Sequence, residues 1–416
     1  DLAYSVQQTS DGGYIVAGLT SSFGANGVFL IKTDANGNII WAKTYERAAA
    51  FSVQQTSDGG YIVAGWTWSF GAGYYDIFLI KTDANGNVVW AKTYGGTDDD
   101  KAYSVRQTSD GGYIVAGYTE SFGAGSIDVF LIKTDANGNI IWAKTYGGMH
   151  GDIAYSVQQT SDGGYILAGY TAPGGLCCDV FLIKTDVNGN LQWAKTYSAT
   201  YDDEAYYVQQ TSDGGYVVAG STGPIGGSKD VLIIKTDANG NITWAKIYEG
   251  TDRTSFVQQT SDGGYIVAGY TASFGAGLDD IFLIKTDANG NIIWAKTYGG
   301  TDFDGAFSVQ QTSDGGYIVA GFTFSFGAGY NDIFLIKTDA NGNIGSCSIV
   351  RSVIPTVNTV SPSVTTPSLS VSSVSPTVYS VSPTVTSPTL NVSSPCPLSI
   401  SEFCQPVSGI ITQHKG

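Results

Sequence analysis

Few side chains in this 416-residue sequence are suited to catalysis. There are two histidines, His150 and His414, and neither has a recurring serine or cysteine with which it could form a nucleophilic triad. The glycine-rich strings are not set between a strand and a helix, as a phosphate-binding loop would be. We therefore predict that the chain is not an enzyme and that it needs no cofactor.

The repeated Asp-x-Asn-Gly-Asn string was considered as a calcium loop. Asp34, Asn36 and Asn38 resemble the first half of an EF-hand loop, but the bidentate glutamate that closes such a loop is missing. A turn in which the Asp side chain caps the backbone and Gly takes a positive φ explains the same spacing. We therefore predict structural turns and no metal site.

Aromatic and acidic side chains gather in the long connections of the chain, where the sequence varies most. The candidate binding residues are Trp66, Trp68, Tyr74, Tyr75, Asp98, Asp99 and Asp100. Further acidic residues at similar connections are Asp202, Asp203, Glu204, Asp279, Asp280, Asp302 and Asp304. Aromatic rings beside carboxylates suit carbohydrate stacking, cation capture or a protein contact. Ordinary variability of surface loops is the alternative interpretation.

These connections join copies of one repeated unit, which is clearest from Ala102 to Tyr146. The Tyr of its Gly-Gly-Tyr element occurs seven times, at Tyr14, Tyr61, Tyr113, Tyr165, Tyr216, Tyr265 and Tyr317. The spacing of roughly 50 residues is typical of a propeller, solenoid or array. The expected strands of the unit are Ala102–Thr108, Tyr113–Thr119, Val129–Thr134 and Ile140–Tyr146. Asp-Gly and Asn-Gly turns separate the first from the second strand and the third from the fourth.

A four-stranded unit with two apolar faces must pack between two neighbours. We therefore predict an all-β, seven-bladed β-propeller over residues 1–350, with one blade for each repeat. The SVQQT strand should lie nearest the axis and the WAKTY strand outermost. Both tight turns should lie on one face of the propeller, and the variable connections on the other.

The repeat resembles the secreted β-propeller repeats of bacteria and archaea of the SBBP type. The match is carried by Gly299-Gly300-Thr301-Asp302 and by the stretch from Ser313 to Thr323, which contains an Asp-Gly turn and a strand ending in Gly-Phe-Thr. The resemblance extends over residues 1 to 346. It implies a propeller and a secreted protein, but that family has no single activity to transfer.

The seventh unit and the residues after it depart from the pattern. After Ile344 the expected Trp-Ala-Lys-Thr-Tyr is missing, so the outer strand of this blade should be weakened or differently used, with an edge open to another strand. Residues 351–416 are predicted to form an extended tail rich in Ser, Thr, Val and Pro. The valines expected to dock it are Val360, Val364, Val374, Val378, Val381 and Val385. The alternative is a disordered stalk, and the sequence leaves open whether the tail docks on its own propeller or on a neighbouring one.

The five cysteines cannot all pair within one chain. Cys396 and Cys404 are the natural local pair, and Cys177 or Cys178 could link to Cys347 or to another copy. Asn241 and Asn391 begin glycosylation sequons. Disulfides and sequons both require a location outside the cytosol.

Charge and hydropathy exclude two classes of partner. The formal net charge is −16, and most of the 20 basic residues recur at framework positions, so nucleic-acid binding is not expected. No run of about 18 apolar residues could span a bilayer. Because the chain begins at Asp1 instead of Met, we interpret it as the mature form of an extracellular or cell-surface protein.

Two functions are favoured by these features, and a propeller hydrolase or lyase acting through loop carboxylates ranks last because no spacing singles out an acid–base pair. The first is a non-enzymatic structural protein that self-assembles head to tail into a surface filament or array, with copies of itself as partners and the tail as the inter-subunit docking segment. The alternative is a lectin or adhesin that binds surface carbohydrates or proteins through its variable loops, with the tail as a stalk.

Overall fold

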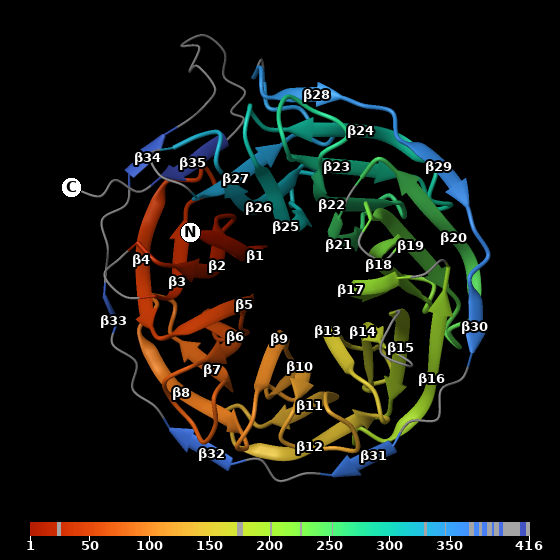
Figure 1. Cartoon of the computed structure of the whole chain (residues 1–416). Helices are drawn as coiled ribbons and strands as arrows, with labels where there is room; N and C mark the ends of the chain where they lie inside the picture. The colour runs from red at the N-terminus through yellow and green to blue at the C-terminus, as the bar shows by residue number, and fades with distance from the viewer. Residues whose placement is uncertain are drawn as a thin grey trace. The chain divides into compact units, whose positions relative to one another are not determined.

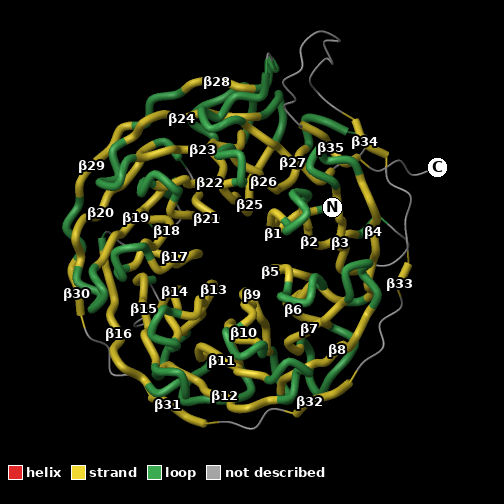
Figure 2. The backbone as a smooth tube through the Cα atoms, turned by 180° about the vertical axis from the view of Figure 1, so that it is seen from behind, coloured by secondary structure: helices red, strands yellow, loops and turns green. Residues whose placement is uncertain are grey.

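The structure is a computed structural model. It describes residues 1–22, 26–172, 178–199, 202–224, 227–251, 253–327, 331–345, 347–365, 370–373, 377–380, 385–386, 391–393 and 408–412. From residue 363 onward, and at 255, only the backbone is described. All regular structure in these residues is β, as the strands in Figure 2 show. The fold is a seven-bladed propeller of four-stranded blades, as the repeat predicted.

The chain divides into two compact units, which are described separately. The first comprises residues Asp1–Glu46, Tyr248–Asn358 and Thr384–Gly416. Its blade 1 contains β1 (Leu2–Gln8), β2 (Tyr14–Thr20), β3 (Gly27–Thr33) and β4 (Ile39–Glu46). Blade 6 contains β21 (Arg253–Gln259), β22 (Tyr265–Thr271), β23 (Asp280–Thr286) and β24 (Ile292–Tyr298). Blade 7 begins with β25 (Asp304–Gln311), β26 (Tyr317–Thr323) and β27 (Asp332–Thr338).

The second unit comprises Arg47–Ile247 and Thr359–Pro383. Blade 2 contains β5 (Ala48–Gln55), β6 (Tyr61–Thr67), β7 (Asp76–Thr82) and β8 (Val88–Gly95). Blade 3 contains β9 (Asp100–Gln107), β10 (Tyr113–Thr119), β11 (Asp128–Thr134) and β12 (Ile140–Gly147). Blade 4 contains β13 (Asp152–Gln159), β14 (Tyr165–Thr171), β15 (Asp179–Thr185) and β16 (Leu191–Ser198). Blade 5 contains β17 (Asp202–Gln210), β18 (Tyr216–Gly223), β19 (Asp230–Thr236) and β20 (Ile242–Glu249).

The first hairpin turn of a blade is held by a buried lysine. In blade 1, Lys32 Nζ lies 2.9 Å from Asp11 Oδ2 and donates to Thr33 O at 2.6 Å. The two glycines of the turn have different roles. Gly12 has a φ of 85°, while a Cβ on Gly13 would lie 2.1 Å from Thr33 O. The Ser-Asp-Gly-Gly string and the distant Ile-Lys-Thr string therefore recur together because they form one contact.

The second repeated contact joins neighbouring blades. Tyr94 Oη on β8 donates to Gly138 O in the Asp-Ala-Asn-Gly-Asn turn of blade 3 at 2.7 Å, and Lys92 Nζ donates to Asn139 Oδ1 at 2.8 Å. A Cβ on Gly138 would lie 2.8 Å from the Trp90 ring. The WAKTY strand and the turn of the next blade are thus two halves of one joint.

The first strands of successive blades are also tied to each other. In the second unit, Gln107 N donates to Gln54 Oε1 at 2.6 Å, and Ser57 N donates to Gln107 Oε1 at 2.8 Å. In the first unit the same bridge joins the two ends of the repeat array, because Gln8 N donates to Gln310 Oε1 at 2.5 Å across 302 residues. Blade 1 therefore packs beside blade 7.

Blade 7 obtains its fourth strand from the end of the chain. The strand β35 (Ser408–Thr412) pairs antiparallel with β27, with Ile333 opposite Ile411 and Ile336 opposite Ser408. The sequence predicted an edge differently used or open to another strand, and the structure fills that edge with the chain's own C-terminal segment.

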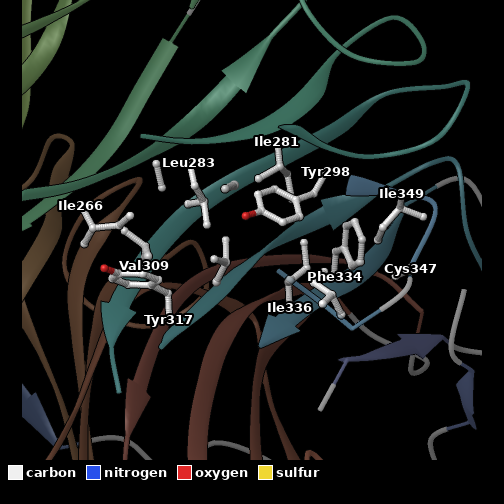
Figure 3. Close-up of a cluster of buried hydrophobic side chains, with 14 residues drawn as sticks. Ile266, Ile281, Leu283, Tyr298, Val309, Tyr317, Phe334, Ile336, Cys347 and Ile349 are labelled. Carbon is white, nitrogen blue, oxygen red and sulfur yellow. The ribbon is translucent and has the colours of Figure 1, made fainter. Parts of the chain in front are cut away.

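The core of this region is drawn in Figure 3. Ile281 and Tyr298 of blade 6 face Phe334 and Ile336 of blade 7 within one buried cluster. Cys347 and Ile349, which follow the missing WAKTY segment, are buried in the same cluster.

The tail adds a strand to every blade, in reverse order of the blades (Figure 1). Its strands are β28 (Val350–Ser352) on β24, β29 (Thr356–Thr359) on β20, β30 (Ser363–Thr365) on β16, β31 (Ser370–Ser373) on β12, β32 (Thr377–Ser380) on β8, β33 (Val385–Thr386) on β4, and β34 (Asn391–Ser393) on β35. Each of these sheets therefore has five strands. In this structure the described tail segments pair with the chain's own blades.

Candidate binding surface on the variable loops

The predicted binding residues lie where the connection between β6 and β7 meets the connection between β8 and β9. A main-chain hydrogen bond joins these loops, because Asp100 N donates to Tyr75 O at 2.8 Å. Asp98 N donates to the side chain of Ser121, in the connection between β10 and β11, at 3.0 Å. A Cβ on Gly73 would lie 2.8 Å from Asp98 O, so only glycine fits between the loops there. The strands thus bring together residues that are about 30 positions apart in the sequence.

Lys101 lies at the centre of these aromatic rings. Its Nζ is 4.2 Å from the ring centroid of Tyr75, 5.2 Å from that of Trp66 and 5.6 Å from that of Tyr118. It also lies 3.3 Å from Asp99 Oδ2. A cation within about 6 Å of a ring face is stabilised by the ring quadrupole. The protein's own lysine therefore occupies the place in which a ligand cation was considered.

The predicted aromatic residues divide into two groups. Trp66 and Tyr75 are half-buried, 4.9 Å apart in an edge-to-face arrangement, and Trp66 also stacks on Phe51 at 6.3 Å. Trp68 and Tyr74 remain in solvent, with 36% and 77% of their surface exposed. Only the second pair presents aromatic surface to a partner.

The three consecutive carboxylates also have different environments. Asp98 is exposed, Asp99 is half-buried beside Lys101, and Asp100 is fully buried. Asp100 Oδ2 accepts hydrogen bonds of 2.8 Å from Gly96 N and from Ser121 Oγ. Burial, with the nearby Asp76 charge as a smaller cause, raises the pKa of Asp100 to about 6. The assignment of Asp100 to a ligand-facing loop surface was therefore wrong, since it is a buried residue at the start of β9.

The sequence reasoning missed Lys101 and Tyr118. One signal was available, because Lys101 is a lysine outside the Ile-Lys-Thr and Trp-Ala-Lys positions that hold most of the others. Tyr118 stands in the repeated Ala-Gly-aromatic-Thr string and gave no such signal.

One group of side chains in the described residues has the spacing of a metal site. Ligand atoms of Cys178, Asp202 and Glu204 all lie within 4.8 Å of one another. Lys229 Nζ, however, is 2.9 Å from Asp202 Oδ2 and 3.0 Å from Glu204 Oε1, so an ammonium already pairs with both carboxylates. Burial, followed by the Asp202 charge, raises the pKa of the Cys178 thiol to about 12, and a protonated thiol is a poor ligand and nucleophile.

The cysteine predictions are corrected at one position. Cys178 is a free thiol, whereas the sequence analysis considered it as a disulfide partner. Its described neighbours are the Asp202 and Glu204 carboxylates and not another sulfur atom. Cys347 is disulfide-bonded. The other candidates, Cys177, Cys396 and Cys404, lie outside the described residues.

The Asp side chain of each repeated Asp-Ala-Asn-Gly-Asn turn is hydrogen-bonded by groups of the same turn. Asp34 Oδ1 accepts from Asn36 N and Asn38 N, each at 2.8 Å, and Asp34 Oδ2 accepts from Asn38 Nδ2 at 2.8 Å. At Asn241, the first sequon, the equivalent side chain donates to Asp237 Oδ2 and accepts from Lys195 Nζ. A glycan there would have to displace these contacts. Only the backbone of the second sequon residue, Asn391, is described.

The predicted docking valines fall into three classes. Val364, Val378 and Val385 pair with Tyr197, Tyr94 and Tyr45 of the outer strands. Val360 donates its N–H to Ala245 O at 3.0 Å. Val374 and Val381 lie outside the described residues. Seven tail valines recur at every seventh residue, one for each of the seven blades: Val350, Val357, Val364, Val371, Val378, Val385 and Val392.

Comparison with known proteins agrees with this architecture. Residues 56–88 match the model of a domain of unknown function (DUF5122) beta-propeller. The chain is a β-propeller repeat protein. No curated protein matches it. The described residues contain no helix that could serve as a membrane span.

Several solved structures are similar at low identity. One is a protein of unknown function from Bacteroides caccae, at 13% identity and a TM-score of 0.40, covering 67% of this chain and 92% of that one. Another is Sqt1 from Chaetomium thermophilum, at 12% identity and a TM-score of 0.46, covering 85% and 86%. The Dos1 propeller matches at 11% identity and a TM-score of 0.46, covering 80% and 76%. These likenesses say nothing about what this chain does.

Proposed function

We propose that this chain is a non-enzymatic, extracellular structural protein whose copies assemble by exchanging tail strands. The observation that carries the proposal is the match between the seven blades and seven tail valines that recur at every seventh residue. A spacer or stalk has no need of a regular set of valines whose number equals the number of blade edges beneath it.

The pairing between tail and blades is nearly the same at each position. Val350 lies opposite Tyr298, Val371 opposite Tyr146 and Val378 opposite Tyr94, always in an antiparallel pair. Because the outer strands share the WAKTY pattern, a tail strand that fits one blade also fits the equivalent blade of another copy. Contacts that close one chain can then join two chains at little cost, as in domain swapping.

The extracellular location is supported by Cys347, because structural disulfides persist mainly in oxidising compartments. The Ser, Thr and Val composition of the tail agrees with it. Partners in this proposal are other copies of the same chain.

The test is negative-stain electron microscopy of the full chain over a range of concentrations. A triple variant, Val364→Pro, Val371→Pro and Val378→Pro, should lose its filaments or strings, because proline disrupts strand pairing in β30, β31 and β32 while β35 is left in place. The matched control replaces the same valines with threonine, which keeps the N–H groups and should still assemble. Single particles of the unaltered chain at every concentration would contradict the proposal.

A second candidate function is binding of surface carbohydrate or protein through the variable loops. It is favoured by the exposure of Trp68 and Tyr74 beside the exposed Asp98, since an exposed ring can stack on a sugar face while a carboxylate accepts from its hydroxyls. Trp66 is a poor probe because it also supports Lys101.

Glycan-array binding tests this candidate. The double variant Trp68→Ala and Tyr74→Ala should lose binding at least tenfold, while Phe303→Ala, which removes a 41% exposed ring elsewhere, should not. Equal signals from all three proteins would exclude these loops as the binding surface.

A further inference from the structure

Pairs of buried aspartates recur where neighbouring blades meet. One member begins the third strand of a blade, and the other lies at the start of the first strand of the next blade. The pairs in the second unit are Asp76 with Asp100, Asp128 with Asp152 and Asp179 with Asp203, and the first unit contains Asp280 with Asp304. Six of these eight side chains are no more than 1% exposed. Two buried carboxylates side by side are unfavourable unless a cation or a proton lies between them.

The pair at the junction of blades 3 and 4 is described most completely. Asp128 Oδ2 accepts from Ala124 N at 2.9 Å and from Gly125 N at 3.0 Å, so this oxygen organises the loop. Asp128 Oδ1 is buried and has no hydrogen-bond partner. An unpaired buried carboxylate oxygen costs free energy, so an unrecorded group is expected beside it.

The unpaired oxygen points toward the second carboxylate. A Cβ on Gly147 would lie 1.8 Å from Asp128 Oδ1 and 3.0 Å from Asp152 Oδ2. Since both carboxylate oxygens lie within about 3 Å of the same point, one ion with oxygen ligands at about 2.3–2.6 Å could contact both of them. Asp152 Oδ2 accepts from Gly148 N at 3.1 Å. A small, mostly apolar cavity at the same junction is lined by Asp152, Thr171 and Thr196 together with Val129, Tyr146, Phe181 and Ile183. The one basic side chain that acts on Asp152 is the exposed His150.

Two other junctions repeat this geometry. A Cβ on Gly95 would lie 2.2 Å from Asp76 Oδ1 and 2.7 Å from Asp100 Oδ2. A Cβ on Gly299 would lie 1.9 Å from Asp280 Oδ1 and 2.8 Å from Asp304 Oδ2, and Arg351 of β28 also acts on Asp280. At each of these places a Cβ would lie against the first carboxylate, so a larger residue fits only if that carboxylate shifts.

The junction of blades 4 and 5 differs and serves as an internal control. Ser198 stands where the other junctions have glycine, and its side chain hydrogen-bonds to Asp179. At this junction a serine hydroxyl of the chain hydrogen-bonds to Asp179, the residue that corresponds to Asp128. At Asp128 the Oδ1 atom has no such partner.

We propose that the glycine-containing junctions, Asp76 with Asp100, Asp128 with Asp152 and Asp280 with Asp304, each bind a divalent cation of the calcium type. Hard carboxylate oxygens are the ligands calcium prefers, and its variable coordination number allows water or a threonine hydroxyl to complete the shell. Each ion would join two blades and offset their paired charges. The sites are independent of the tail and of the proposed function.

Calorimetric titration of calcium chloride into the full chain, after dialysis against a chelator, tests the proposal. We expect about three ions per chain with dissociation constants on the order of 10⁻⁴–10⁻³ M, as in other extracellular sites. Asp128→Asn should lower the stoichiometry by one ion. Gly147→Ser should do the same by installing the serine that blade 4 already has, so it provides a second test if Asp128→Asn fails to fold.

The matched control is Asp179→Asn, at the same position of the repeat, which should leave the stoichiometry unchanged. The proposal is overturned if no calcium binds, if Asp179→Asn loses as much as Asp128→Asn, or if magnesium and sodium give the same response. Stabilisation by acid without any response to calcium would also overturn it, because the pairs would then share a proton.

Discussion

Blades 6 and 7 share nearly the same first three strands and differ in how the fourth is supplied. The third strands β23 and β27 both read DIFLIKT, and each is buried along its length. In blade 6 the chain turns back at once and adds β24. In blade 7 it leaves after Ile344, and β35 arrives some 60 residues later to pair with β27.

The difference shows that strands of different sequence can pair with the edge of the third strand. Tyr298 lies opposite Ile281 in blade 6, and Ile411 lies opposite Ile333 in blade 7. Tyr298 also donates to Gly342 O at 2.7 Å, a joint to the next blade for which isoleucine has no hydroxyl. Backbone pairing therefore makes the strand, while the side chains of WAKTY connect one blade to the next.

The largest effect should come from removing the borrowed strand. A chain ending at Val407 lacks β35 and leaves β27 as an unpaired edge. Loss of the pairing over four residues should lower the free energy of unfolding by about 4 kcal/mol, at about 1 kcal/mol for each hydrogen bond. Exposed edges also pair with other chains, so light scattering should report aggregation.

Chemical denaturation of this truncated chain gives the free energy, and a chain ending at Thr412 is the control because it keeps β35. An unchanged midpoint for the shorter chain would show that blade 7 is complete with three strands.

The next effect concerns the joint to the next blade that blade 6 makes through Tyr298 and for which blade 7 has no tyrosine at the equivalent position. Tyr298→Phe removes a buried hydroxyl and leaves Gly342 O without its donor. The expected loss is about 1–3 kcal/mol, the cost of an unsatisfied buried carbonyl. Thermal unfolding would measure it, with Tyr74→Phe, at an exposed ring, as the control that should not change.

Much of this architecture could be predicted from the sequence because each blade repeats local signals. Strands bounded by Asp-Gly and Asn-Gly turns define the blades, and the loss of WAKTY after Ile344 correctly pointed to an unusual edge. The tail was harder to interpret, because strands of two to five residues, rich in Ser, Thr and Val, carry little β signal of their own. The outer strands of two copies of the chain have the same sequence. No sequence pattern could therefore decide whether the tail pairs with its own blades or with those of another copy.

The candidate binding surface was predicted only in part, for a different reason. Composition placed Trp66, Trp68, Tyr74 and Tyr75 in one variable region, which was correct. Their exposure differs, because Trp66 and Tyr75 are half-buried around Lys101 whereas Trp68 and Tyr74 are exposed. A single cation among aromatic residues changes which rings can meet a ligand, and its effect becomes evident only once the strands bring them together.

Weakening a fifth strand should lower the stability less than removing a fourth strand does. Val353 N donates to Ala295 O at 3.0 Å, so Val353→Pro removes one hydrogen bond between the tail and blade 6. We expect a loss of about 1 kcal/mol and faster proteolysis of the tail, with the blades still folded. Ile354→Pro, at a 92% exposed residue, is the control. Global unfolding by Val353→Pro would mean that the fifth strand is as important as the fourth.

The smallest effect on stability should come from an ion pair that blades 6 and 7 both contain, between the aspartate of the first hairpin turn and the lysine of the third strand. Burial alone would raise the pKa of Asp262, but hydrogen bonds from Thr260, Lys285 and Gly264, with the Lys285 charge, bring it to about 2. A pKa below that of the unfolded chain, about 4, stabilises the fold above pH 4, and this contribution is lost as the pH falls toward 2.

Asp314 makes the same contacts in blade 7 with Lys337, and its pKa is also lowered. Both aspartates are more than half exposed, so solvent weakens the effect and high salt should weaken it further. The thermal midpoint should therefore fall slightly less between pH 7 and pH 2 in Asp262→Asn and in Asp314→Asn than in the unaltered chain. The difference from the unaltered chain should be similar for the two variants. A clear difference between these variants would mean that the borrowed strand also alters the turn at the far end of β27, and that the two blades differ in more than their fourth strand.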